Sequence, residues 1–293
     1  MPLPFVYHQG NITEIAAMTH FHTPDPVAID LVPFEEVHLP DALALSQAVG
    51  WPHRAEDWAL NLTASKGVVA VAEGRVMGTA LCSLHGPVAT LNMIIVDAAL
   101  RGRGVGKRLM EGIIALGGAR EMRLVATEEG KPLYRKLGFV ETGQIVQLQG
   151  VAAPATPEQP FTASPGDPGL MAQMDFQASG MDRAALLGRI AAQGTTLVTD
   201  GGFALLRAFG RGHVLGPVVA RDPAAARALM AAGANRMAGS FLRMDLPEAH
   251  GLAPFAETLG LRRAGGGTAM VRAARPRDPS PFQTHALISQ ALG

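Results

Sequence analysis

A glycine-rich turn between an apolar β-run and an amphipathic helix limits what this chain can fold into more than any other segment. The run ends at Val96, and the turn that follows holds Gly102, Gly104 and Gly106 at alternate positions. Glycine is expected where the backbone must approach another group closely. A helix that begins near Gly104 directs free N–H groups and the positive end of its dipole at such a group. The segment therefore predicts an anion site, for which a pyrophosphate is the natural ligand.

Two widespread phosphate-binding motifs do not fit this turn. A Walker loop needs Gly-Lys followed by Ser or Thr, whereas Lys107 is followed by Arg108. A Rossmann fingerprint needs a third glycine where Lys107 stands, after a strand of a parallel sheet, and the preceding runs are predicted to be antiparallel. A helix-capping turn without a ligand remains as an alternative interpretation.

The pattern Arg-x-x-Gly-x-Gly, formed by Arg101, Gly104 and Gly106, resembles the acetyl-CoA pyrophosphate loop of the GNAT N-acetyltransferase superfamily. Residues 133–139 (Leu-Tyr-Arg-Lys-Leu-Gly-Phe) resemble the Leu-Tyr-x-x-x-Gly-Phe signature that closes the cofactor site in that family. The resemblance spans residues 28–148 and implies acetyl-CoA as the cosubstrate. The residues that it implies for CoA binding are Ile94, Ile95, Val96, Arg101, Gly102, Arg103, Gly104, Val105, Gly106 and Lys107.

The resemblance also implies direct attack of an amine on the thioester, with no covalent enzyme intermediate. Tyr134 matches the family's tyrosine near the CoA sulfur, and a phenol of pKa ~10 can protonate a leaving thiolate of pKa ~8.5. A half-buried structural aromatic is the alternative. Some members place a glutamate near the position of Thr90, which is not a carboxylate, so the general base stays open. The nearby candidates are His53, Glu56, Asp57, His85 and a water relayed by Asn92.

Both tryptophans of the chain fall in the segment Trp51–Trp58, where the family places its acceptor-covering helices. They are expected either to wall an acceptor pocket or to anchor two helices on the sheet. The residues expected to contact the acceptor, a small-molecule or peptide amine, are Trp51, His53, Trp58, His85 and Asn92.

The expected fold is α/β (α+β), with two fused GNAT-like domains, each a mixed, mostly antiparallel sheet flanked by helices. Residues 28–150 are predicted to run helix, meander, helix, strand, helix, strand, as an acetyltransferase domain. Residues 167–293 repeat this order and resemble the degenerate GNAT-like domain of a bacterial tandem family. The proline-rich residues 151–166 predict a linker, and residues 1–27 an N-terminal extension.

The second half is expected not to bind CoA in the usual way. Its counterpart of the pyrophosphate loop, Val219–Arg227, has no glycine, and Asp222 would repel a diphosphate. We expect this half to pair its sheet with the first half and to close the acceptor pocket. Gly265–Gly267 is predicted to be a turn, and Gln283–Leu292 a terminal helix.

Composition excludes several classes of protein. Lys+Arg and Asp+Glu are both 25, which argues against nucleic acid as a partner. The chain lacks an apolar run of the ~18 residues that a membrane span needs, and its start is unlike a secretory signal, so a cytoplasmic protein is expected. Cys82 is the only cysteine and is predicted to lie in the core, and we expect no metal.

These observations predict an acetyl-CoA-dependent N-acetyltransferase that acts on a primary amine. A non-catalytic acyl-CoA-binding sensor and an acyltransferase that uses a longer acyl-CoA are the alternatives. The chain is expected to be either a monomer, as an internal pseudo-dimer, or a homodimer.

Overall fold

The computed structural model describes residues 28–293, so the extension predicted at residues 1–27 lies outside the described residues. The elements in chain order are β1 (Asp30–Pro33), η1 (Glu36–His38), α1 (Leu39–Ala48), α2 (Ala55–Leu62), β2 (Ser65–Ala72), β3 (Arg75–His85), β4 (Val88–Val96), η2 (Ala98–Leu100), α3 (Val105–Gly117), β5 (Glu121–Ala126), α4 (Lys131–Lys136), β6 (Val140–Val151), β7 (Thr162–Ala163), α5 (Pro168–Ser179), α6 (Ala184–Gln193), β8 (Thr195–Thr199), β9 (Gly202–Phe209), β10 (Gly212–Ala220), α7 (Pro223–Arg236), β11 (Phe241–Pro247), η3 (Glu248–His250), α8 (Ala253–Thr258), β12 (Arg262–Arg272) and β13 (Gln283–Ala286).

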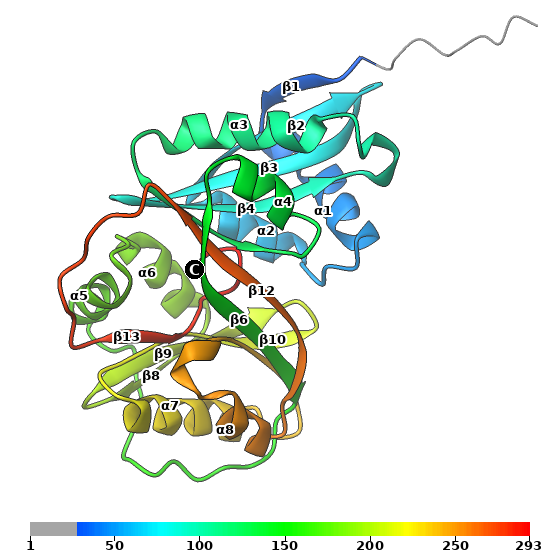
Figure 1. Cartoon of the computed structure of the whole chain (residues 1–293). Helices are drawn as coiled ribbons and strands as arrows, with labels where there is room; N and C mark the ends of the chain where they lie inside the picture. The colour runs from blue at the N-terminus through cyan, green and yellow to red at the C-terminus, as the bar shows by residue number, and fades with distance from the viewer. Residues whose placement is uncertain (1–27) are drawn as a thin grey trace, which may run out of the picture.

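A single 13-stranded sheet runs through both halves of the described chain (Figure 1). Its order is β1-β2-β3-β4-β5-β12-β6-β11-β10-β9-β8-β7, with β13 paired to β10. The antiparallel meander expected in the first half is present as β2, β3 and β4. The mixed α/β fold and the pairing of the sheets of the two halves are therefore confirmed.

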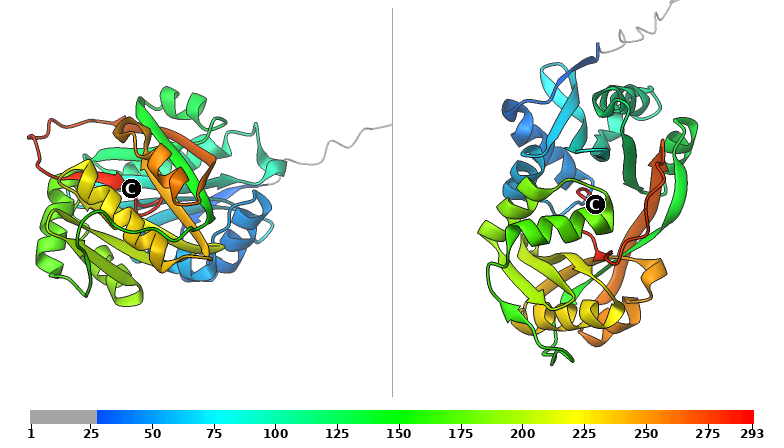
Figure 2. Two further views of the ribbon diagram at one scale, coloured as in Figure 1. Left: turned by 90° about the horizontal axis from the view of Figure 1, so that it is seen from below. Right: turned by 90° about the vertical axis from the view of Figure 1, so that its left-hand side faces the viewer.

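The two halves exchange their last long strands. β12 belongs to the second half but lies between β5 and β6, and Thr268–Arg272 pair with Met122–Ala126. β6 belongs to the first half but pairs along β11 of the second. Neither half therefore completes its sheet alone, and the domain boundaries at residues 150 and 167 stay predictions. The turned views show these long strands joining the halves, with the C-terminal end of the chain between them (Figure 2).

Apolar side chains hold helices on both faces of the sheet. In the first half, Leu109, Met110 and Ile113 of α3 are fully buried against β3 and β4. Cys82 lies in the same core, and burial raises the pKa of its thiol to about 11, so the thiol stays protonated. Within residues 28–293, no helix has the length and apolar character that a membrane span would require.

Two local predictions for the second half are wrong. Gly265–Gly267 lie inside β12, where a Cβ on Gly266, whose φ is +149°, would stand 2.1 Å from the Ile145 carbonyl oxygen. The glycines thus allow close strand contact instead of forming a turn. Gln283–Leu292 is not a helix, because Gln283–Ala286 form β13 and pair with the edge of β10. Helix α5 was not predicted.

Candidate active site

Strands β4 and β5 diverge soon after they start. Their parallel ladder joins only Val88–Thr90 with Glu121–Arg123. A bulge follows in β4, where Met93 has a φ of +50° and the register with β3 shifts. Beyond the bulge, the β5-facing edge of Ile94–Val96 has no strand partner in residues 28–293. Backbone polar groups in such a place need a partner, so this edge can pair with an amide-bearing ligand chain.

The glycine-rich turn lies at the end of this divergence. Gly104 is the N-cap of α3 with a φ of +76°, and no side chain caps this helix end. A Cβ on Gly102 or Gly104 would meet nothing within 4 Å, so the backbone is open to a ligand. The side chains of Arg101 and Lys107 are exposed around it. The turn thus combines free amides, a helix dipole and positive charge, which suits a diphosphate.

The other predicted CoA-loop residues have distinct surroundings. Val105 is 1% exposed and points into the core, so only its backbone can contact a ligand. Gly106 sits between Val96 and Leu133, whose side chains lie 3.7 and 3.6 Å from an added Cβ. The Arg103 side chain is exposed. The predicted residues therefore lie along the chain from the end of β4 to the first turn of α3, where Ile95 and Val105 are buried and the others are exposed or half-buried.

Tyr134 in α4 is 7% exposed and packs its ring edge-on against Phe139 at 6.3 Å. Gly130 lies against the same ring, and a Cβ there would stand 3.1 Å from the phenol oxygen. The hydroxyl makes no hydrogen bond within the described part of the chain. Burial raises the pKa of Tyr134 to about 12, so the phenol keeps its proton at neutral pH.

A small buried polar cluster lies on the α2-facing side of β3 and β4. The Asn92 amide donates to the Ser83 hydroxyl at 2.9 Å, and its oxygen accepts from Asn61 at 2.8 Å. Ser83 is the cross-strand partner of Thr90, whose buried hydroxyl has no hydrogen-bond partner in residues 28–293. Asn92 is thus held by protein partners, and the position expected for a family carboxylate carries an unpaired hydroxyl.

The residues expected to contact the acceptor do not form one group. Trp58 has no exposed surface, stacks on Phe34 at 6.0 Å and donates to Ser46 at 3.2 Å. It packs α2 into the core, as the anchoring alternative expects, and its role as an acceptor contact stays a prediction. Trp51 is half-buried and packs on the cluster that contains residues of β4. His53 lies between Trp51 and Phe209 of the second half, at ring distances of 5.7 and 5.4 Å.

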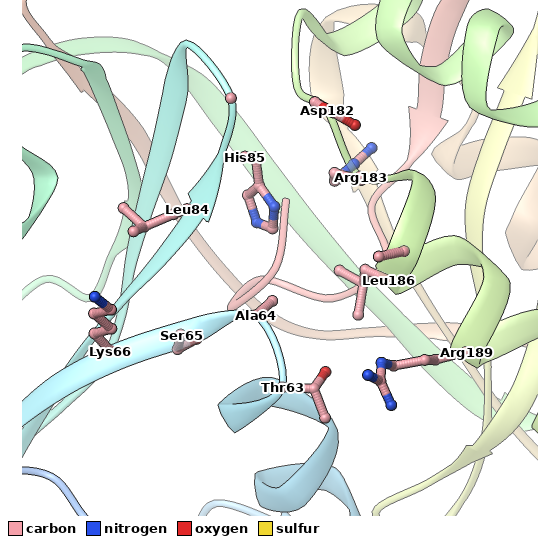
Figure 3. Close-up of a pocket in the computed structure, with 12 residues that line it drawn as sticks. Thr63, Ala64, Ser65, Lys66, Leu84, His85, Asp182, Arg183, Leu186 and Arg189 are labelled. Carbon is pink, nitrogen blue, oxygen red and sulfur yellow. The ribbon is translucent and has the colours of Figure 1, made fainter.

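Two cavities open where the halves meet. The first has a volume of about 430 Å³ and lies between the β3–β4 hairpin and α6. His85 points into it, and Asp182 and Arg189 form its far wall (Figure 3). The second, of about 300 Å³, borders the loop before α2 and is lined by Gln147 and Arg243 among others. His85 thus lines the first cavity, whereas Trp51 and His53 line neither, although their neighbours Gly50 and Pro52 line the second.

Asp57 and Glu56 are poorly placed to act as the base. The Asp57 carboxylate accepts hydrogen bonds from the Arg54 side chain at 2.9 Å and from the Gly210 amide at 2.9 Å, and it pairs with Arg207 at 3.4 Å. Burial acts to raise its pKa, but these hydrogen bonds lower it overall. The ionised Asp57 carboxylate thus connects the two halves through hydrogen bonds and an ion pair. Glu56 is exposed on the outer side of α2.

Arg183 holds the end of the chain between the halves. Its buried guanidinium pairs with Asp175 at 2.6 Å and donates to the main-chain oxygens of Leu292 at 3.2 Å and Gly293 at 2.5 Å. Ala291 packs on the core cluster that contains Trp58. The second half thereby closes the face of the first half opposite α3.

Three buried histidines predict that the protein loses stability in mild acid. Burial lowers the pKa values of His53, His85 and His285 to about 4. The unfolded chain takes up these protons from about pH 6.5 downward and the folded chain does not, so the free energy of unfolding falls as pH drops from ~6.5 to ~4. Urea titrations should give a lower midpoint at pH 5 than at pH 7. His85→Leu should reduce this difference in midpoint, whereas the control His213→Leu, at a half-exposed site, should reduce it less. Equal reductions in the two variants would contradict a role of the buried His85 in the acid sensitivity.

Comparison with known proteins identifies the family. A family model described as an acetyltransferase (GNAT) domain matches residues 64–141, and another with the same description matches residues 171–281. The chain belongs to the GNAT superfamily. With one match in each half, it is a tandem GNAT protein, as the sequence motifs implied.

Several known proteins are similar to this chain in fold or in sequence. A putative acetyltransferase from Pyrococcus horikoshii is similar with a TM-score of 0.79 over 94% of this chain and 100% of that one, at 18% identity. A tandem GNAT protein from the clavulanic acid biosynthesis pathway has a TM-score of 0.58, covers 86% and 98%, and is 16% identical. The uncharacterized N-acetyltransferase YitH of Bacillus subtilis strain 168 is 29% identical over 123 residues, which span 41% of this chain and 43% of that protein.

In the second GNAT half, the gap between β10 and β11 corresponds to the gap between β4 and β5, and β13 fills it. β10 and β11 pair only at His213–Val214 with Leu242–Arg243, and β13 then pairs with β10 in the gap. The Leu287 amide donates to the Asp245 carbonyl at 2.9 Å, which ties the following residue to β11. Asp222 caps α7 by accepting from the Ala225 amide at 2.9 Å. The chain itself thus fills the place where a cofactor arm would lie.

Sequence reasoning missed the arginines that the second half brings to the second cavity. Arg243 and Asp245 alternate with buried apolar residues along β11, and Arg211 lies in the turn after β9. Such alternation marks a strand with one polar face, and this signal could have identified the face that meets the first half.

Proposed function

We propose that this GNAT protein transfers an acetyl group from acetyl-CoA to a primary amine, and that the reaction takes place in its first half. The divergence of β4 from β5 after three residue pairs carries the proposal, because it leaves an unpaired backbone edge that leads to the open glycine turn. The edge at Ile94–Val96 would pair with the pantetheine arm, and Arg101–Lys107 would hold the diphosphate.

The reaction requires one bond to form and one to break. The amine nitrogen attacks the thioester carbonyl carbon, the C–N bond forms and the C–S bond breaks. The proton that the amine loses balances the one that the thiol gains. Tyr134 would donate a hydrogen bond and then a proton to the developing thiolate, and its high pKa keeps the phenol protonated for this role.

The structure supports a water-mediated route for the amine proton over a carboxylate base. Asp57 is bound by arginines, and burial lowers the pKa of His85 to about 4, which makes its imidazole a weak base. The unpaired Thr90 hydroxyl and the Asn92 amide lie on one face of β4, and the cavity at His85 opens on the same side. We propose that water along these groups carries the proton away from the amine.

Calorimetry and thiol release together test the proposal. We expect one acetyl-CoA to bind per chain, because β13 fills the second cleft, and free thiol to appear when a panel of primary amines is added. Repeating the assay with succinyl-CoA and longer acyl-CoAs defines the donor. Binding without turnover on any amine would favour an acyl-CoA sensor. Two molecules bound per chain would contradict the closure of the second half, and no binding would overturn the proposed function.

A further inference from the structure

The second cavity differs from the rest of the junction in the charges that line it. Its wall contains Pro52 before α2, Gln147 and Gln149 on β6, Phe209, and the arginines Arg211 and Arg243. Both charged groups in the wall are guanidiniums, and no carboxylate of residues 28–293 lines it. We call this space the arginine cavity.

The carboxylates behind the wall are already neutralised. Asp245 has no exposed surface and pairs with Arg243 at 2.9 Å. Asp57 pairs with Arg54 and Arg207. Arg207 and Arg243 also stack on the Phe209 ring, at 4.9 and 5.3 Å from its centre. The local charge is therefore positive, although the chain as a whole is neutral.

Arg243 is held rigidly yet keeps hydrogen-bonding capacity. Its side chain is about nine-tenths buried, and Nε and Nη2 donate to Asp245 at 3.0 Å each. The third nitrogen, Nη1, makes no hydrogen bond within the described residues. Beside it, the Gln147 amide donates to the Gln149 oxygen at 2.9 Å, which leaves the Gln149 NH₂ group free to donate. Fixed donors around a positively charged hollow favour an oxyanion.

The arginine cavity lies next to the proposed transfer site. Gly50 and Pro52 line the cavity, and Trp51 between them packs on the cluster that contains Met93 and Ile95 of β4. Trp51 thus links the loop that lines the cavity to the core cluster that contains the diverging part of β4. An elongated acceptor could then place one end in the cavity and its amine at the divergence.

We infer that the arginine cavity binds an anionic group, a carboxylate or a phosphate, carried by the amine acceptor. The inference rests on the proposed function for the amine's role. The volume of about 300 Å³ suits part of a small molecule such as an amino acid, and not a folded partner.

Matched amine pairs test this inference. Lysine and cadaverine differ by one carboxylate, and O-phosphoethanolamine and ethanolamine differ by one phosphate, so the two pairs separate the two sources of charge. We expect the anionic member of at least one pair to show a KM about 10- to 100-fold lower, as for hydrogen bonds to a charged group. Equal KM values within both pairs, or a preference for the uncharged members, would overturn the inference. Acetylation of any of these amines would still support the proposed function, so the two outcomes are distinguishable.

Variants of Arg211 test whether the anionic group binds in the arginine cavity. Arg211 is exposed at the cavity mouth, so Arg211→Gln should fold normally. It should raise the KM of the preferred anionic amine about 10-fold and leave its uncharged partner and the affinity for acetyl-CoA unchanged. Arg211→Glu should raise that KM further. Arg236→Gln, at an exposed site at the end of α7, is the matched control and should change neither value.

Direct binding keeps the inference testable if no amine is acetylated. Lysine and O-phosphoethanolamine are titrated into the protein by NMR without acyl-CoA, and the same titration is repeated with Arg211→Glu. Saturable binding that Arg211→Glu abolishes would support an anion site even if the transferase proposal fails. Absence of binding, or binding that the variant does not change, would overturn the inference.

Discussion

Gly104→Asp should weaken acetyl-CoA binding about 10- to 100-fold more than Gly104→Asn does, which corresponds to ~1.4–2.8 kcal/mol from one added charge beside a diphosphate. The two side chains have nearly the same shape, and Asn and Asp are the residues that best tolerate a left-handed backbone. Gly104 has a φ of +76°, and an added Cβ meets nothing within 4 Å, so neither variant should clash. The difference between them isolates charge from strain.

Calorimetric titration of acetyl-CoA into both variants measures this difference, and urea unfolding confirms that they are equally stable. Gly239→Asp is a matched control, because Gly239 has a φ of +78°, equally open surroundings and a position in the second half. It should leave the affinity unchanged. If Gly104→Asp and Gly104→Asn bind acetyl-CoA equally well, the turn does not hold the diphosphate and the proposed site is lost.

Local sequence was sufficient for the parts of the site that depend on local geometry. The three glycines of the turn and the motif around Tyr134 specify backbone shape and side-chain type within a few residues. The structure accordingly places them at the end of β4, at the start of α3 and in α4. Helix α3 could be predicted with its buried face, because its apolar spacing follows one period over 13 residues.

Non-local pairing explains what the sequence could not specify. Gln283–Ala286 are too few residues for periodicity to separate helix from strand, and hydrogen bonds to β10 decide the outcome. The exchange of β6 and β12 has no local signal, because each strand would carry the same pattern next to either partner. Nothing in the local sequence distinguishes Trp51 from Trp58. Trp58 is nevertheless fully buried and Trp51 only half-buried, because only Trp51 lies in the loop that meets the second half.

The exchange also explains how a second half without an open cleft can influence the reaction. Because β12 pairs with β5, the second half forms one border of the proposed CoA cleft. Because Arg207 of β9 pairs with Asp57 of α2, the same half is also joined to the other side of the first half, and it supplies Arg211 and Arg243 to the proposed acceptor cavity. We therefore propose that the second half, which has closed its own cleft, serves the first half as a scaffold and as one wall of its acceptor site.

Tyr134→Phe should lower kcat about 100- to 1000-fold while the affinity for acetyl-CoA changes less than about twofold, in the range expected for loss of a general acid. Phenylalanine keeps the packing on Phe139 and fits beside Gly130. Because the hydroxyl makes no hydrogen bond in the described residues, the variant should unfold at nearly the same urea concentration at pH 7. Phe139→Leu disturbs the same packing but keeps the phenol, so it should reduce kcat far less.

The pH dependence gives the Tyr134→Phe variant a second readout. The pKa of Tyr134 is raised by burial to about 12, above the ~10 of an unfolded tyrosine, so the folded state holds this proton more tightly. The resulting stability is fully present below pH ~10 and is lost as pH rises toward ~12. Wild type should therefore lose more stability than Tyr134→Phe between pH 9 and 11. Equal turnover of the two proteins would remove Tyr134 from the chemistry, and equal pH profiles of stability would show that its phenol is not desolvated.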